Sequence, residues 1–279
     1  MMTTEPLLIA QLAPGVTGLI LNRPANRNAL SVALLEGLVA GLKTARADPE
    51  CRVIVLGARG PVFSAGGDLK DPRIAWVGEP GSSEALLSEA TDLIISASQP
   101  VISRVQGPVF GGGVGLVAAT DLVIVDDTAA FVMSETRLGF AATLATPTLV
   151  PRVGMAHALR MMLLGERIGA QEALEVGLAT FAAKTGQLDE VLASTLGLLL
   201  EGGPAGIACT KALVRAAANP ATMPATSDLY RITIELITAD QAKEGAAAAS
   251  QKRRPAWYAA PPAADHLSSF FDLPPPDGS

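Results

Sequence analysis

Hydrophobic positions change along the chain from short apolar runs in the first half to helical spacing in the second. In the first half, β-branched runs bounded by turn residues predict strands at 7–11, 16–21, 51–56, 101–105, 122–125 and 130–133. Amphipathic spacing between those runs predicts helices at 32–46, 84–97 and 112–119. Ser31 is the expected N-cap of the first helix, and Ser82 or Ser83 of the second. The pattern predicts a mixed α/β fold.

The second half is predicted to be mainly helical. Apolar residues at helical spacing predict helices at 156–164, 170–176, 188–201, 204–218, 227–237 and 240–252. Two stretches interrupt the regular pattern. Proline and glycine in 70–83 predict a loop long enough to cover a binding site, and Trp76 could line that site or anchor the loop. The proline-rich segment 259–279 is expected to be a poorly ordered tail, although Phe270 and Phe271 could dock it.

Two glycine-rich turns carry the candidate chemistry. One is Phe-Ser-Ala-Gly-Gly-Asp-Leu at 63–69, and the other is Gly-Pro-Val-Phe-Gly-Gly-Gly-Val-Gly-Leu at 107–116. Each follows a predicted buried strand and leads into a helix. Glycine permits sharp bends and close approach to a ligand, and a helix N-terminus presents unpaired N–H groups. Two such turns could direct two N–H donors at one oxygen, which is the arrangement of an oxyanion hole.

These two turns resemble the signature segments of the crotonase superfamily, which includes the enoyl-CoA hydratases and isomerases. Further segments that match this family in order are Asn-Arg-Pro at 22–24, Ser-Glu-Thr-Arg-Leu-Gly at 134–139, Pro-Arg-Val-Gly at 151–154, Ala-Gln-Glu-Ala at 170–173 and Lys-Arg-Arg-Pro at 252–255. The resemblance covers residues 7–258. It implies an α/β (α+β) fold in which ββα units form a spiral core.

The resemblance also implies a division of the chain. Residues 1–200 would form the spiral core with an acyl-CoA site, and residues 201–258 a helical region used for oligomerisation. The remaining 259–279 would be the tail. Family members are trimers or pairs of trimers, so a homotrimer or a dimer of trimers is expected.

For the site, the resemblance assigns the two oxyanion donors to the backbone N–H groups of Gly67 and Gly112. They would hold the thioester carbonyl of an acyl-CoA, which is the substrate, and no further cofactor is implied. Neighbouring positions are assigned to substrate binding: Ala65, Asp68 and Leu69 on the CoA side, Gly115, and Arg23 and Arg27. The two arginines could meet CoA phosphates or be solvated loop charges.

Proton transfer is where this chain departs from the family. Hydratases of the family hold one water between two glutamates, and the corresponding positions here are Gly115 and Glu135. A carboxyl in an apolar pocket has a raised pKa, which suits Glu135 to acid–base catalysis. Gly115 removes the other carboxylate and is expected to free space for a branched acyl chain. Whether Asp68, Glu84 or Glu89 supplies a second acid stays open.

Three functions fit these residues. We favour hydration of a 2-enoyl-CoA with Glu135 as the single glutamate. An enoyl-CoA isomerase is the alternative, because moving a double bond requires one base and no water. The third function is that of a non-catalytic acyl-CoA-binding protein.

A dinucleotide-binding site is the main rival from another class of enzyme. Gly113-Val114-Gly115-Leu116-Val117-Ala118 fits the Gly-x-Gly-x-x-Gly/Ala pattern. That site requires an acid at the end of the strand paired to the glycine turn. The next predicted strand already ends near position 126, too early for a full crossover helix. The rival also leaves the first glycine turn unexplained.

Composition excludes several other classes of function. The net charge is −6, from 27 acidic and 21 basic residues, and there is no extended basic block, which argues against nucleic-acid binding. The two cysteines, Cys51 and Cys209, form no disulfide framework, and the histidines His157 and His266 lack metal-site spacing. We therefore expect no metal. Without a secretory leader or an apolar run long enough to cross a membrane, a cytoplasmic protein is expected.

Overall fold

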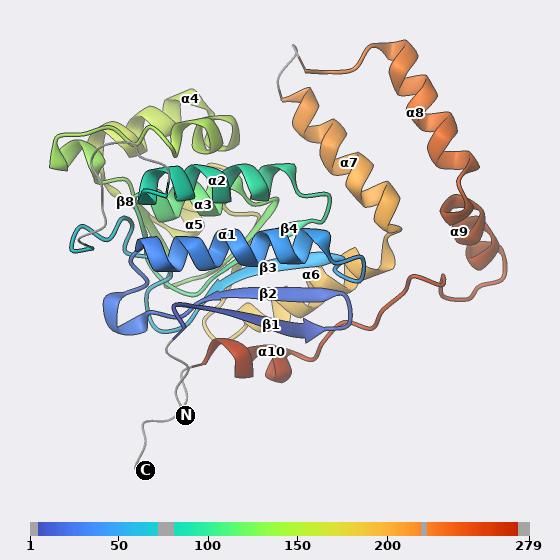
Figure 1. The fold of residues 1–279 in the computed structure, drawn as a ribbon, viewed down its shortest axis with the longest axis horizontal. Coiled ribbons are helices and arrows are strands. Elements are labelled where there is room, and N and C mark those ends of the chain that lie inside the picture. Colours follow the sequence, from blue (N-terminus) through green and yellow to red (C-terminus); the bar gives the residue numbers. More distant parts are fainter. Residues whose placement is uncertain (1–4, 72–80, 219–221, 273–279) are drawn as a thin grey trace.

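The computed structural model describes residues 5–71, 81–218 and 222–272, so Trp76 lies outside the described residues. The main sheet has six strands in the order β1-β2-β3-β4-β6-β9 (Figure 1). Their bounds are Leu7–Ala13, Val16–Leu21, Val53–Ala58, Val101–Val105, Leu122–Asp126 and Phe181–Ala183. β1 and β2 form an antiparallel hairpin, and the later pairs are parallel. A second, three-stranded sheet contains β5 (Val109–Phe110), β7 (Ala130–Val132) and β8 (Arg167–Gly169).

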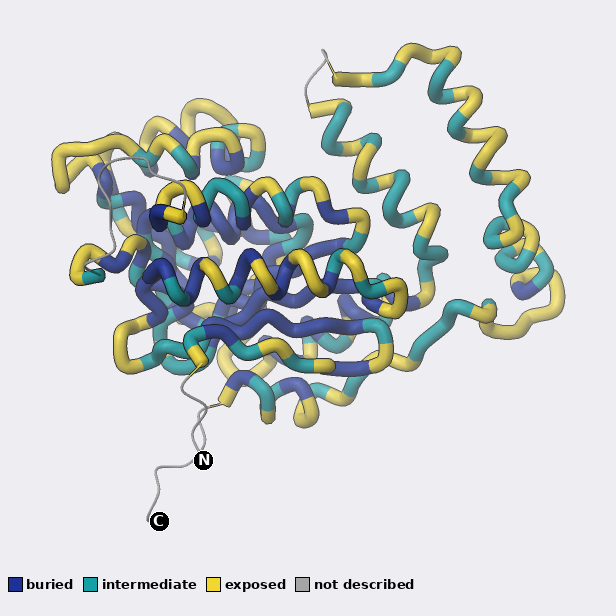
Figure 2. Tube along the Cα trace, viewed as in Figure 1, coloured by how far each residue is buried: buried dark blue, intermediate teal, exposed yellow. Residues whose placement is uncertain are grey.

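Helices cover both faces of the main sheet, so its central strands β2, β3 and β4 are buried along their whole length, whereas the edge strands β1 and β9 have exposed residues (Figure 2). Alternate residues of β3 show the two faces. Ile54 and Leu56 belong to the core beneath the helices of one face, and Val53 and Val55 belong to the core on the other. The first face carries α1 (Val32–Ala47), α2 (Ser83–Ser96) and α3 (Gly112–Ala119), and the second carries α6 (Leu188–Glu201) and α10 (Ala264–Phe271). This layering is the mixed α/β fold expected from the sequence.

The starts of α1 and α2 follow the predicted capping chemistry. The Ser31 hydroxyl accepts a hydrogen bond from the Leu34 N–H at 3.3 Å, and the Ser82 hydroxyl accepts one from the Ala85 N–H at 3.2 Å. Each hydroxyl satisfies one of the N–H groups that a helix leaves unpaired in its first turn. Of the two serines considered for the second helix, Ser82 is the cap.

The middle of the chain differs from the prediction. α4 spans Thr146–Leu164, so it begins well before the expected Ala156. The first part of α4 was not predicted from the sequence for two reasons. Pro151 lies inside it, and Gly154 has a left-handed φ of 75° that kinks the helix. After α4 the chain forms β8, α5 (Ala170–Glu175) and β9. The short strands β8 and β9 had not been expected, because three residues carry too little pattern to be recognised.

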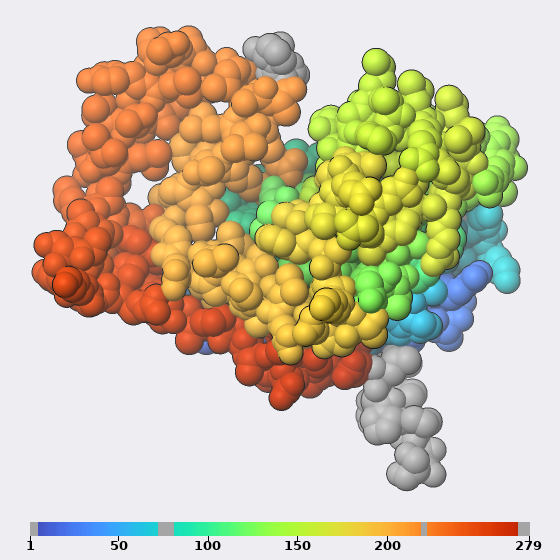
Figure 3. All heavy atoms as spheres, turned by 180° about the vertical axis from the view of Figure 1, so that it is seen from behind, coloured from blue at the N-terminus to red at the C-terminus, as the bar shows by residue number. Residues whose placement is uncertain are grey.

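The C-terminal helices α7 (Pro204–Ala217), α8 (Thr226–Thr238) and α9 (Asp240–Ser250) project from the core (Figures 1 and 3). No described residue of α7 or α8 is buried, and Val214, Tyr230 and Ile237 are strongly exposed. No single helix in the described ranges is long and apolar enough to cross a membrane; α6 and α7 pass that test only as a pair bent by 106°. The predicted role of residues 201–258 in oligomerisation stays a prediction.

Part of the expected tail is ordered, so that expectation was wrong for residues 264–271. This segment forms α10, and its Leu267 and Phe271 are buried against the main sheet. Gly57 in β3 makes room for the ring, since a Cβ there would lie 2.2 Å from the Phe271 Cε1. The docking of Phe271, weighed above as a possibility, is what the structure shows. Burial of this aromatic ring stabilises the helix, although the segments around it are rich in proline.

Candidate active site

The two glycine-rich turns lie against each other, although they are more than forty residues apart in sequence. Ser64 and Val109 form a parallel bridge, and the Phe110 N–H donates to the Ser64 carbonyl oxygen at 2.9 Å. Gly66 has a left-handed φ of 80°, and a Cβ there would lie 3.0 Å from the Phe110 carbonyl oxygen and 3.6 Å from the Gly111 Cα. Glycine at this position therefore permits both the bend and the contact between the turns.

Both predicted oxyanion donors lie in one pocket formed by these turns. Gly67 and Gly112 line it together. Gly112 is the first residue of α3, where helical geometry leaves the N–H without an internal acceptor. In the described part of the chain, neither backbone N–H donates a hydrogen bond to another residue. The pair is therefore free to receive a ligand oxygen.

The pocket has a volume of about 360 Å³ and a largely apolar wall. Among its lining residues, Ala65, Gly67, Leu69, Gly112 and Glu135 were identified from the sequence. The residues that sequence reasoning missed are chiefly Leu87 of α2 and the segment 138–145, including Leu138 and Phe140. These residues line the pocket because of how distant elements pack. No local sequence motif identifies them. An apolar chain of modest size fits such a wall.

Glu135 lines the pocket three residues after the end of β7, at the start of a short 3-10 helix, Glu135–Leu138. Its side chain is close to the second glycine turn, since a Cβ on Gly111 would lie 3.1 Å from Glu135 Oε1. Glu135 is only 8% exposed, and its Oε2 atom is buried without a hydrogen-bond partner among the described residues. Burial raises the pKa of Glu135, and a hydrogen bond from its own backbone N–H lowers it by less. A buried carboxyl with a free oxygen is suited to proton transfer.

Gly115 does not create the expected space. It is buried within α3, and a Cβ there would lie 3.0 Å from the Cβ of Ala145 and 3.1 Å from its Cα. The Thr148 hydroxyl also donates to the Gly115 carbonyl oxygen at 3.1 Å. The start of α4 thus fills the volume that a side chain would take. Gly115 itself is not among the residues lining the pocket, and Ala145 is.

Three charged residues assigned to substrate binding, Arg23, Arg27 and Asp68, do not line the pocket. Arg23 binds Asp68 at 2.9 Å and donates to the Ala29 carbonyl oxygen, so these two side chains hold the first glycine turn to the loop after β2. Arg27 is exposed and has a left-handed φ of 51°. Its backbone carbonyl accepts a hydrogen bond from the Ala65 N–H at 2.9 Å. Arg23 and Arg27 therefore flank the turn without lining the pocket.

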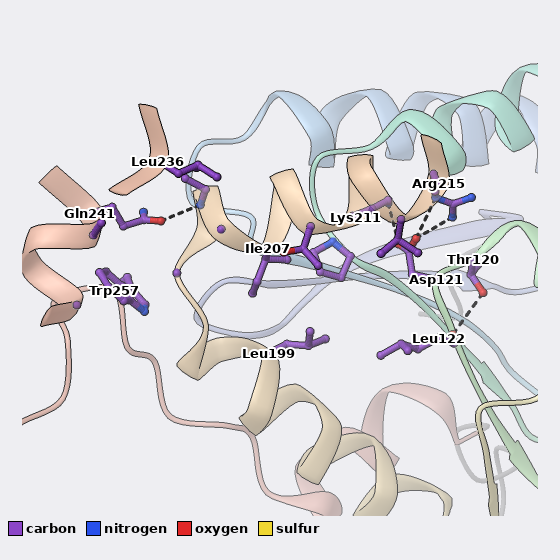
Figure 4. Close-up of a pocket in the computed structure, with 18 of the residues that line it drawn as sticks. Thr120, Asp121, Leu122, Leu199, Ile207, Lys211, Arg215, Leu236, Gln241 and Trp257 are labelled. Atoms are coloured by element: carbon purple, nitrogen blue, oxygen red, sulfur yellow. Dashed lines mark hydrogen bonds and ion pairs between the residues drawn. The ribbon is translucent and has the colours of Figure 1, made fainter. Parts of the chain in front are cut away.

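A larger cavity, of about 930 Å³, lies between the core and the projecting helices (Figure 4). Its charged residues form ion pairs and hydrogen bonds within the protein. Lys211 and Arg215 of α7 each bind the Asp121 carboxylate at 2.7 Å, and Lys211 also donates to the Ile94 and Gln99 carbonyl oxygens. These contacts attach α7 to the core. Arg152, the other charged residue of the lining, donates to the Leu178 and Thr120 carbonyl oxygens. Since these charged groups bind the protein itself, the smaller pocket around Glu135 is the better candidate for chemistry.

Comparison with known proteins gives a consistent result. The sequence model of the family described as "Enoyl-CoA hydratase/isomerase" matches residues 12–260. A Rhodobacter capsulatus protein named "Probable enoyl-CoA hydratase" is 34% identical over 252 residues, covering 88% of this chain and 95% of the relative. The hydroxycinnamoyl-CoA hydratase-lyase of Pseudomonas fluorescens is 33% identical, covering 72% of this chain and 75% of the relative.

Solved structures share the fold as well. AtuE of Pseudomonas aeruginosa superimposes with a TM-score of 0.83 at 32% identity, covering 91% of this chain and all of that one. An enoyl-CoA hydratase of Mycobacterium smegmatis gives a TM-score of 0.81 at 30% identity, covering 90% of this chain and 98% of that one. The matched length spans the core and most of the C-terminal helices.

Proposed function

The chain belongs to the enoyl-CoA hydratase/isomerase family, and from this premise we propose that it hydrates a 2-enoyl-CoA. The thioester carbonyl oxygen accepts hydrogen bonds from the Gly67 and Gly112 N–H groups, which draws electrons toward that oxygen. The β-carbon of the enoyl group becomes electrophilic, and water adds there. Glu135 delivers the proton that C2 receives. The observation that carries this proposal is the Glu135 Oε2 atom, which lies in the pocket of the two N–H groups and has no hydrogen-bond partner among the described residues.

The protein's contribution to rate comes mainly from donors that are already in place. Both glycine turns are fixed by bridges and backbone hydrogen bonds, so little rearrangement is needed when charge develops on the oxygen. Each such donor typically lowers the barrier by about 3 kcal/mol. The apolar wall formed by Leu87, Leu138 and Phe140 would surround the acyl chain and exclude bulk water from it.

Ultraviolet absorbance of the conjugated enoyl thioester tests this function. The wild-type protein is mixed with straight and branched 2-enoyl-CoA and with a 3-enoyl-CoA, beside Glu135→Gln and the exposed-loop control Glu50→Gln. Loss of conjugation from a 2-enoyl-CoA, abolished by Glu135→Gln alone, supports hydration. Gain of conjugation from the 3-enoyl-CoA would instead make the protein an isomerase, and no change with any thioester would refute catalysis.

We propose further that the protein is a homotrimer or a dimer of trimers in which α7 and α8 pack between subunits. The support is the absence of any buried residue among the described positions of these two helices, together with exposed apolar side chains such as Tyr230 and Ile237. Light scattering coupled to size-exclusion chromatography distinguishes three or six copies from one.

A further inference from the structure

Three acids besides Glu135 could supply the second proton-transfer group of a hydratase, and the structure separates them. Asp68 is bound to Arg23 at 2.9 Å, and Glu89 is bound to Lys43 at 2.6 Å. The Glu84 side chain makes no hydrogen bond or ion pair with another described residue. Of these three acids, Glu84 alone lines the pocket that contains Glu135. Among the described lining residues, Glu84 and Glu135 are the only titratable ones.

The position of Glu84 follows from its helix. It lies in the first turn of α2, three residues before Leu87. Residues three apart share a helix face, with their Cβ atoms about 5–6 Å apart. Leu87 packs against the second glycine turn, because a Cβ on Gly112 would lie 2.9 Å from Leu87 Cδ2. Glu84 is therefore one helical turn from the wall that contains an oxyanion donor.

The two acidic residues that line the pocket come from different elements. Glu135 comes from the segment after β7 and lies beside Gly111, whereas α2 lies beside Gly112. Glu84 is exposed to solvent and Glu135 is buried. Burial favours the protonated form of Glu135, which can donate a proton, whereas the exposed Glu84 side chain is accessible to water.

We propose that Glu84 is the base that takes a proton from the attacking water, replacing the carboxylate missing at Gly115. This inference rests on the proposed hydratase function. An O–H bond of water breaks, its proton goes to Glu84, and the oxygen forms a bond to C3. The C2–C3 π electrons move to the thioester oxygen as an enolate. The enolate then takes a proton from Glu135 at C2, and Glu84 returns the water's proton to Glu135 through solvent.

Glu84→Gln tests the assignment, with Glu89→Gln on the same helix as the matched control. The first readout is hydration of crotonyl-CoA, for which general-base removal should lower kcat about 10²-fold or more, with KM changed little. The second readout is deuterium uptake at C2 of butyryl-CoA in deuterated water, which requires the oxyanion hole and Glu135 but no attacking water. We expect Glu84→Gln to keep this exchange within about threefold of the wild type, and the control to keep both activities.

The outcomes separate this proposal from the function on which it rests. Hydration by Glu84→Gln within about threefold of the wild type would overturn the role of Glu84 and leave the hydratase intact. Equal loss of hydration and exchange would also overturn it, because a defect in folding or binding affects both. A wild-type protein that hydrates no 2-enoyl-CoA would refute the hydratase and the role of Glu84 with it.

Discussion

Ala145 lies where a side chain on Gly115 would begin, 3.0 Å from that Cβ position. The start of α4 therefore occupies the space beside Gly115, and a side chain at this position would require a rearrangement. We expect Gly115→Ala to destabilise the protein by about 1–3 kcal/mol through overpacking. Gly206→Ala, on the exposed face of α7 with no neighbour near its Cβ position, should stabilise by about 0.5–1 kcal/mol. Urea denaturation measures both, and equal effects would contradict the packing argument.

Gly67→Ala should separate activity from stability. Among the described residues, apart from the two adjacent ones, no atom lies within 4 Å of a Cβ built on Gly67, which lines the pocket. A methyl group there would therefore enter the ligand space without disturbing the fold. We expect kcat/KM for an enoyl-CoA to fall about tenfold or more, because the carbonyl oxygen would be displaced from its donors. The melting temperature should stay close to the wild-type value. Full activity of this variant would contradict the prediction, because it would mean that the thioester binds at another position.

The raised pKa of Glu135 makes a prediction about stability and pH. Burial raises this pKa above the ordinary 4.5, so the protonated form favours folding, and that contribution is lost as pH rises through the folded-state pKa. Glu135→Gln should therefore gain stability relative to the wild type as pH increases from below 4.5 to neutrality. Chemical denaturation across this range measures the difference, and a pH-independent difference would contradict it.

The elements that could be predicted from the sequence are those with a repeated pattern or a cap. The six strands expected in the first half and the caps Ser31 and Ser82 depend on neighbouring residues, so the sequence specifies them locally. The turn glycines were recognisable because their motifs are continuous in sequence.

What could not be predicted depends on packing between distant elements. Ala145 fills the space beside Gly115 because α4 happens to begin there, and the sequence around either residue gives no sign of it. Arg23 could be assigned to a phosphate or to solvent from its loop, whereas its partner Asp68 is 45 residues away. Helix α10 was hidden by the prolines around it, because its stability comes from the surface that it covers.

Phe271 should be a main contributor to the docking of α10. Its ring is buried over Gly57, and the guanidinium carbon of Arg104 lies 4.2 Å from the ring centroid. We expect Phe271→Ala to lower the free energy of unfolding by about 3–5 kcal/mol. Phe270→Ala, at a half-buried neighbour, should cost much less. Thermal and urea unfolding of the two variants provide the comparison, and equal losses would refute it.

Asp189 should be needed to keep Arg104 buried. Its carboxylate accepts hydrogen bonds from Arg104 Nε at 2.6 Å and Nη2 at 2.8 Å, and from the Ser268 hydroxyl of α10 at 2.7 Å. Asp189→Ala leaves a buried guanidinium without its counter-charge, which typically costs about 3–5 kcal/mol. Glu190→Ala, at the exposed neighbouring position, should change stability by less than about 0.5 kcal/mol. The same unfolding measurements decide between them.

The packing of Phe271 on Gly57 has a consequence for how the protein is made. The ribosome completes β1, β2 and β3 long before it reaches α10, which together with α6 covers one of their faces, as the Arg59–Phe270 hydrogen bond across 211 positions illustrates. Until α10 emerges, the apolar side chains that it covers stay exposed, which makes the nascent chain prone to aggregation or to capture by chaperones. A stop codon before residue 264 would make that transient state permanent.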